Sequence, residues 1–272
     1  MEAFIDFFEH MSNGTKFAWI LICLIFSWGL EGFAPLVRFK YNKVKHDSRN
    51  LIFLGTSMLI NILIGITTVG VYVWVDQNNF GFLNAVDWSP WVELLIAVMF
   101  LDLVAQYVAH YLLHRIKWMW KFHMVHHSDT KVDATTGTRH HPGDYLIREV
   151  FSLIAVILSG MPLGFYLFYR IATIFFAYFT HANFYMPTWL DKALSWVIIT
   201  PNMHKFHHHY ERPWTDTNFG NIFSFWDRIF GTFVYDDPRK VKYGLDVLQG
   251  KDDEDVLYQF KLPFDKTVKT DY

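Results

Sequence analysis

The sequence predicts an all-α fold, an integral membrane bundle of helices with a histidine-rich helical cap on the cytoplasmic side that holds a dinuclear metal site. Two observations predict the bundle. The chain of 272 residues is 52% hydrophobic and 19% aromatic, and its apolar stretches reach the roughly 20 residues that a helix needs to cross a bilayer. A third observation predicts the cap, because twelve of the fourteen histidines lie between His110 and His209. A formal net charge of -2 leaves no basic surface for nucleic acid, and a single cysteine excludes an internal disulfide.

Three membrane spans are predicted before the histidines begin, over residues 17–37, 51–75 and 91–113. Residues 38–50 carry five Lys and Arg side chains, whereas residues 76–90 carry none. Because basic loops stay on the cytoplasmic side, the first loop is predicted to be cytoplasmic. The third span then ends on that side and delivers His110 and His114 to it. Glu31, near the end of the first span, is expected to reach toward water.

The apolar residues 147–179 are interrupted by the turn-forming sequence GMPLG at 160–164. The two pieces, of roughly a dozen and fifteen residues, are short for a straight span. A hairpin that dips into the membrane and returns is favoured over full spans, because a single long span would separate His204 from His110. Residues 187–201 are predicted to form an interfacial helix, and four tryptophans are predicted to be interface anchors: Trp118, Trp120, Trp189 and Trp196.

The histidines occur in three boxes with the spacing of one helix face. The first box is HxxxH, and the second and third are both HxxHH. Histidines three or four residues apart lie on one side of a helix and can chelate a metal together. A single catalytic zinc usually takes three protein ligands and a structural zinc four, so eight imidazoles predict two metals. Imidazole alone does not distinguish Zn, Cu, Fe and Ni.

In order along residues 101–235, the chain has HYLLH, FHMVHHSD, TTGTRHHPGD, THANFYMP, TPNMHKFHHH and DTNFGNIFSFWDRIFGTF. This series resembles the fatty acid hydroxylase/sterol desaturase superfamily of membrane-bound, non-haem di-iron oxygenases. The resemblance implies a cytoplasmic di-iron centre that uses dioxygen and external electrons on a lipid C–H bond. Residues 1–100 would then be the membrane anchor, 101–235 the catalytic region and 236–272 a polar cytoplasmic tail.

The resemblance implies nine metal ligands, because it adds one histidine from the THANFYMP segment to the three boxes. They are His110, His114, His123, His126, His127, His181, His204, His207 and His208. Three positions depart from the family pattern, since Tyr111 stands where an arginine is frequent, Thr180 where a second histidine is frequent and Asp144 where a glutamate is frequent. Four side chains are expected to stand behind the ligands and orient them: Asp102, His141, Asp144 and Asp216. His10, His46, His140 and His209 are expected to be packing or interfacial residues.

The chemistry implied by the resemblance favours iron. An unactivated C–H bond calls for a redox-active metal, and zinc, which could substitute in the same ligands, has no redox chemistry. The chain has no GxGxxG and no cysteine set, so the electrons are expected from a ferredoxin, a cytochrome b5-like protein or a reductase.

Two other functions stay open. A membrane zinc hydrolase lacks support because no HExxH occurs, and a non-catalytic metal-binding or lipid-binding protein would be marked by a missing box histidine. Whether a membrane lipid, a sterol-like molecule or a fatty acyl chain is the substrate, and whether it is hydroxylated or desaturated, is not settled by these residues.

Overall fold

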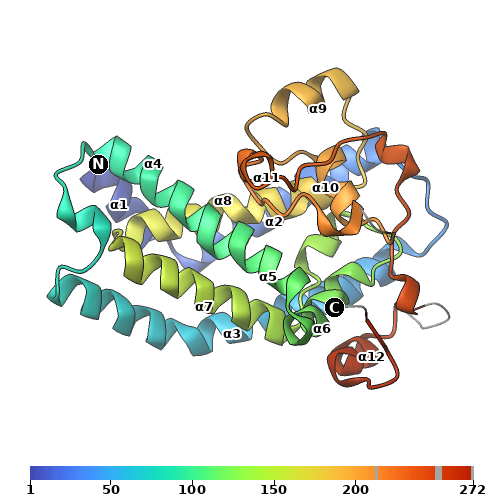
Figure 1. Ribbon diagram of the computed structural model, residues 1–272, viewed down its shortest axis with the longest axis horizontal. Coiled ribbons are helices and arrows are strands. Elements are labelled where there is room, and N and C mark those ends of the chain that lie inside the picture. Colours follow the sequence, from blue (N-terminus) through green and yellow to red (C-terminus); the bar gives the residue numbers. More distant parts are fainter. Residues whose placement is uncertain (212–213, 249–252, 271–272) are drawn as a thin grey trace.

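The computed structural model describes residues 1–211, 214–248 and 253–270. These residues form helices and loops, and their β pairing is limited to two isolated bridges, Pro35 with Phe184 and Ile198 with Phe223. The long helices lie side by side along the long axis, and the short helices α6 and α9 to α12 gather at one end of them, whereas the short helix α1 lies at the other end (Figure 1). We call the end with α6 and α9 to α12 the cap. The all-α bundle with a helical cap is therefore confirmed.

Among the described residues, four helical segments are long and apolar enough to cross a membrane. They are α2 (Asn13–Phe33), α3 (Lys43–Gln77) with the following turn η1 (Phe82–Ala85), the continuous run from α4 to α5, and α8 (Leu163–His181). The run consists of α4 (Pro90–Leu101), a π-helical segment η2 (Asp102–Val108) and α5 (Ala109–Arg115). Large apolar side chains are exposed on these segments, among them Leu63 and Ile66 of α3, as expected where lipid is the solvent.

Helix α3 is longer than the predicted span. Its 35 residues extend over about 52 Å at 1.5 Å per residue, compared with about 30 Å for the hydrocarbon core of a bilayer. The additional turns carry the buried polar residues His46, Asp47 and Asn50. Asn50 donates to Thr135 in η3 (Ala134–Thr138), so the beginning of α3 is part of the cap.

Residues 142–181 form a helical hairpin, α7 (Pro142–Ser159) followed by α8, and α8 is by itself long and apolar enough to cross a membrane. Gly160 takes a left-handed conformation between them, and a Cβ on Gly81 would lie 2.2 Å from the Gly160 nitrogen. The hairpin turn therefore packs against the loop between α3 and α4, at the end of the bundle remote from the cap. The observed helices are longer than the expected pieces, because α7 begins at Pro142, before the apolar run, and α8 continues to His181, beyond it.

The remaining elements belong to the cap, except α1 (Glu2–Glu9), which packs against α8. The cap elements are α6 (Lys117–His127), η3, α9 (Thr188–Leu194), α10 (Pro201–His207), η4 (Trp214–Asp216), α11 (Phe225–Ile229), η5 (Pro238–Lys240), η6 (Asp246–Leu248), α12 (Val256–Lys261) and η7 (Leu262–Phe264). The interfacial helix predicted over residues 187–201 is shorter in the structure, since α9 ends at Leu194.

Two expectations about single residues are wrong. Trp118, Trp189 and Trp196 are exposed, but Trp120 is only 2% exposed and packs with Leu262 and Val268 of the C-terminal segment. Glu31 does not reach for water. It is buried, and its Oε1 accepts hydrogen bonds from the backbone nitrogens of Ala134 and Asn183.

Candidate metal centre

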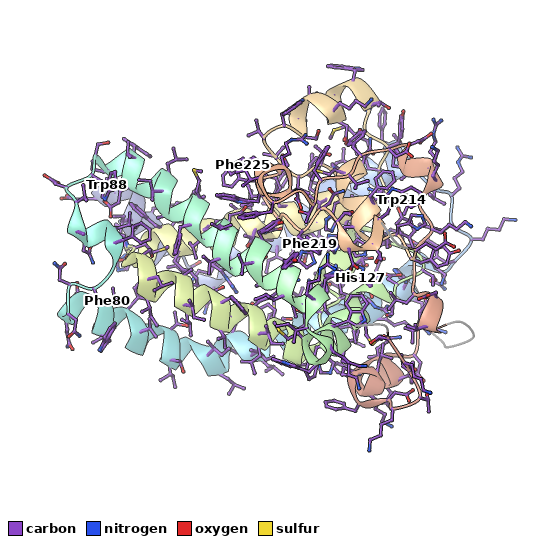
Figure 2. The ribbon with its side chains drawn as sticks, viewed as in Figure 1. Phe80, Trp88, His127, Trp214, Phe219 and Phe225 are labelled. Carbon is purple, nitrogen blue, oxygen red and sulfur yellow. The ribbon has the colours of Figure 1, made fainter. Side chains whose placement is uncertain are left out.

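Nine buried histidines form two groups in the cap, and within each group the nitrogen atoms that could bind a metal lie within 4.8 Å of one another. The first group has five members, His110, His114, His123, His127 and His207. The second has four, His126, His181, His204 and His208. Figure 2 shows His127 with Phe219 at the cap, whereas Phe80 and Trp88 mark the opposite end of the bundle.

Helix geometry divides each HxxHH box between the two groups. His123 and His127 are four residues apart on α6 and face the first group, whereas His126 faces the second. Successive residues are rotated by about 100° around a helix, so adjacent histidines cannot point to the same place. The third box divides in the opposite sense, since His204 and His208 face the second group and His207 faces the first.

The break between α5 and α6 brings the first two boxes together. Ile116 has an extended backbone, φ -102° and ψ 114°, and α6 begins directly after it. The chain therefore turns back on itself, and His110 Nε2 lies 3.0 Å from His123 Nε2. The π-helical segment η2 immediately precedes α5. Such segments change the register of a helix and are frequent at functional sites.

In the first group, four histidines use Nδ1 to bind oxygen atoms outside the group. The pairs are His110 with the Phe219 carbonyl at 2.9 Å, His114 with Asp216 at 3.2 Å, His123 with Asp144 at 3.1 Å and His207 with the Thr217 carbonyl at 2.7 Å. A carbonyl or carboxylate oxygen accepts, so each Nδ1 must carry the proton. In a neutral ring the Nε2 lone pair is then unprotonated and free to bind a metal.

These Nε2 atoms meet one another. His110 Nε2 and His123 Nε2, both unprotonated, lie 3.0 Å apart, and His127 Nε2 lies 3.2 Å from His114 Nε2 and 3.1 Å from His123 Nε2. Two unprotonated nitrogens are both acceptors and cannot satisfy each other. A cation between them would satisfy both, so the first group fits a metal ion.

In the second group, His181 has the same arrangement, whereas the Nδ1 atoms of His126 and His204 have no hydrogen-bond partner among the described residues. His181 donates from Nδ1 to the Ala177 carbonyl at 2.7 Å, and its Nε2 lies 3.2 Å from His126 Nε2 and 3.0 Å from His204 Nε2. Both ring nitrogens of His208 are buried without a hydrogen-bond partner among the described residues. An unsatisfied buried polar group costs about 1–3 kcal/mol, and metal ligation would remove this cost. The second group therefore also fits a metal ion.

Burial keeps these imidazoles neutral. It lowers the pKa of all six histidines of the second and third boxes, and neighbouring imidazoles lower these pKa values further. The pKa of His123 falls to about 3, although the nearby Asp144 carboxylate opposes the shift. Neutral imidazole is the form that binds metals, so no proton has to leave these rings at neutral pH.

Two of the predicted orienting residues contact the groups directly. Asp144 is fully buried and accepts from His123, from His140 at 2.7 Å and from Arg148 at 3.1 Å. Asp216 accepts from His114. Both carboxylates lie behind an imidazole of the first group, as expected of residues that orient metal ligands.

The other two expected orienting residues have different roles. Asp102 accepts hydrogen bonds from Tyr169, Trp226 and the backbone nitrogens of Ile222 and Phe223, so it anchors a loop instead of an imidazole. It lies at the beginning of η2, eight positions before His110, and faces that loop. His141 caps α7 through the Gly143 nitrogen, and its Nε2 lies 3.2 Å from the Phe260 carbonyl.

His140 takes the position that was expected of His141. Its Nδ1 binds Asp144, and its ring stacks on His126 with centroids 4.5 Å apart. It therefore contacts both histidine groups, through Asp144 on one side and His126 on the other. The sequence could have indicated that His141 caps a helix. Pro142 is typical of the first residue of a helix, and the residue before it is then the N-cap. The remaining histidines, His10, His46 and His209, belong to neither group.

Aromatic side chains surround the first group. The Trp120 ring centroid lies 4.9 Å from that of His114 and 5.5 Å from that of His127. Phe219 is fully buried, with its centroid 5.1 Å from that of His114 and 5.6 Å from that of His110. These rings fill the space around the imidazoles and keep water away from them.

Comparison with known proteins gives a consistent picture. The sequence profile of the family described as fatty acid hydroxylase matches residues 94–232. Ornithine lipid hydroxylase OlsE of Rhizobium tropici is 31% identical over 160 residues, which are 59% of this chain and 47% of that protein. Alkylglycerol monooxygenase of Xenopus tropicalis is 29% identical over 248 residues, 87% of this chain and 50% of that protein. The Homo sapiens alkylglycerol monooxygenase is 26% identical over 176 residues, 64% and 37% respectively.

The chain thus spans about half the length, or less, of these relatives. No solved structure matches it. The profile covers just over half of the chain and includes all nine histidines of the two groups. We conclude that this chain belongs to the fatty acid hydroxylase family, within the fatty acid hydroxylase/sterol desaturase superfamily that its histidine boxes resemble.

Proposed function

We propose that this chain is a dioxygen-dependent di-iron hydroxylase that acts on a C–H bond of a membrane lipid. The observation that carries the proposal is the arrangement of nine buried, facing imidazoles in groups of five and four at the end of apolar helices. One iron would be held by the first group and one by the second. The iron pair, when bound, supplies the redox chemistry that lets dioxygen attack an unactivated C–H bond, which zinc could not supply.

The chain's own residues would hold and orient the ligands. Asp144, Asp216 and the carbonyls of Thr217 and Phe219 keep the proton on Nδ1 and fix the orientation of each ring of the first group that they bind. Such partners also raise the basicity of the ligand. Trp120 and Phe219 exclude water, and so protect the reaction from wasteful loss of oxidising equivalents.

A lipid substrate fits both the bundle and the relatives. The chain is an integral membrane protein with four apolar segments, and its relatives are named as an ornithine lipid hydroxylase and alkylglycerol monooxygenases. Both names describe insertion of oxygen, so we favour hydroxylation over desaturation. Because both histidine groups lie in the cap, we infer that the C–H bond attacked is near the polar end of the lipid.

Hydroxylation needs two electrons and two protons besides dioxygen, and it yields the alcohol and water. The donor would be an external ferredoxin, cytochrome b5-like protein or reductase, since the chain contains one cysteine and no fused redox motif. Residues 38–50, which connect α2 to the first turns of α3, are basic, so the cap is proposed to lie on the cytoplasmic face.

The proposal is tested on protein purified anaerobically in detergent from cells grown on iron-57. About two magnetically coupled irons per chain in the Mössbauer spectrum are expected. Supplied with electrons, lipid extract and oxygen-18 gas, the protein should add one labelled oxygen atom to a lipid. Zinc that iron cannot displace, or protein loaded with iron that does not react with dioxygen, would contradict the proposal.

Variants from each group provide the control. His207→Ala in the first group and His126→Ala in the second should each lower the iron content and abolish turnover. His10→Ala should change neither, because His10 is exposed and contacts Asp6 in α1. Unchanged iron in both cap variants would show that the two groups do not bind the metals.

A further inference from the structure

The peptide between Ala182 and Asn183, directly after His181, is held at both of its polar groups by buried ionisable side chains. Lys205 Nζ donates to the Ala182 carbonyl at 2.6 Å. The Asn183 nitrogen donates to Glu31 Oε1 at 2.9 Å. Since the C=O and N–H of a planar trans peptide point in opposite directions, the two side chains hold it from opposite sides.

Both side chains are unusually buried for their type. Lys205 is 0% exposed and Glu31 is 7% exposed. Lysine and glutamate are almost never fully buried unless paired. Lys205 gives its hydrogen bonds to two carbonyls, those of Ala182 and Pro201, and Glu31 also binds Lys43. The peptide therefore links a buried amine to a buried carboxylate that belongs to the first span.

This arrangement lies where α8 ends. His181 is the last residue of α8 and Ala182 is its cap residue. The final carbonyls of a helix lack partners within the helix, and a lysine side chain can supply a donor. Lys205 directly follows His204 in α10. It thus connects the end of α8, which carries His181, to the helix that carries His204, and the Nε2 atoms of these two histidines are 3.0 Å apart.

Glu31 also connects a third element, η3, to the end of α8. Its Oε1 also accepts from the Ala134 nitrogen at 2.7 Å, which begins η3. In η3, a Cβ on Gly137 would lie 2.3 Å from the Ala177 carbonyl and 3.2 Å from His181 Nδ1. The Ala177 carbonyl is the hydrogen-bond partner of His181. Glu31 therefore fixes both the segment after His181 and the segment that packs on its ring.

We propose that Glu31 and Lys205 are paired positioning residues for the second histidine group, and that together they set its metal affinity. Helix α8 contributes His181 to the second group and no histidine to the first. Displacing the end of α8 should therefore weaken one metal site and spare the other. This inference depends on the proposed function only in assuming that both groups bind metal.

The test uses Glu31→Gln and Lys205→Met in the full chain, with iron analysis and Mössbauer spectroscopy. Each variant should hold about one iron instead of two, with the coupled spectrum replaced by that of an isolated ion. Loss of orienting interactions typically weakens metal binding about 10–100-fold, and we expect this for the second metal only. The double variant should be no worse than either single variant, because both side chains act on one peptide.

Glu149→Gln is the matched control. Glu149 is also a buried carboxylate on a long helix, and it pairs with Arg170 of α8 rather than with the segment after His181. It should keep two coupled irons. If Lys205→Met does not fold, the isosteric variant Glu31→Gln tests the positioning role by itself.

Two coupled irons in the variants would overturn the positioning role, and so would an equal loss of both irons. The wild-type measurement separates this inference from the proposed function. No iron pair in the wild type would refute the proposed function, whereas a pair in the wild type and in both variants would refute only the positioning role.

Discussion

Replacing Asp144 by asparagine removes a negative charge that is 0% exposed and that binds three donors, His123, His140 and Arg148. One oxygen faces both histidines and the other faces Arg148. The amide of asparagine has one oxygen and one NH2 group, so in either orientation at least one donor faces another donor. If His123 loses its acceptor, we expect metal affinity at the first group to fall about 10–100-fold, or about 1.4–2.7 kcal/mol. Leaving Arg148 without its carboxylate should further cost about 3–5 kcal/mol of folding stability.

The assay is chelator competition on the iron-loaded protein together with thermal unfolding in detergent. Asp102→Asn is the matched control, because Asp102 is also 0% exposed and also accepts several hydrogen bonds, but from Tyr169, Trp226 and backbone nitrogens. It should lower the unfolding temperature without changing metal affinity. Equal losses of metal affinity in the two variants, or none in Asp144→Asn, would refute the assignment of Asp144 as the orienting carboxylate.

Three further predictions follow from the packing, the pKa values and the topology. Trp120→Ala should lower the free energy of unfolding by about 3–5 kcal/mol, whereas the exposed Trp118→Ala should change it by less than about 0.5 kcal/mol; thermal unfolding of both variants measures this, and equal effects would contradict it. In metal-free protein, His123 stays neutral to about pH 3 while the unfolded chain takes up its proton near pH 6.5, so stability present at pH 7.5 should fall by about 2 kcal/mol per such imidazole at pH 5. An unfolding temperature that is the same at pH 5 as at pH 7.5 would contradict this prediction. For topology, a cysteine at Asn79 should react with an impermeant label outside intact cells and one at Asn42 should not, with little background from the buried Cys23, and the reverse pattern would invert the orientation.

The structure has helices over the apolar runs and brings the nine predicted histidines together in two groups, and both features follow from local spacing. Apolar runs determine spans, and HxxHH places three imidazoles on neighbouring positions of one helix. The sequence did not predict how each box divides. His126 and His127 are adjacent in the chain, and which group each one faces depends on where α5, α8 and α10 lie around α6.

The residues that were missed have partners far away in the sequence. Glu31 binds residues 134 and 183, His141 lies against Phe260, and Trp120 packs on the C-terminal segment. No local pattern reports such contacts. Glu31 looked like an isolated charge near a span end, and the usual behaviour of such a charge is to reach for water. Only the tertiary structure shows the amide groups that stabilise it in the interior.

The order in which the two histidine groups are synthesised limits how the protein can be assembled. The ligands of both groups extend from α5 to His208 after α10, so neither group is complete until the third box has left the ribosome. By then α2, α3 and α8 have been made and can enter the bilayer. Metal loading would thus be a late event, after membrane insertion, and until it occurs the facing imidazole nitrogens of each group would have no metal between them.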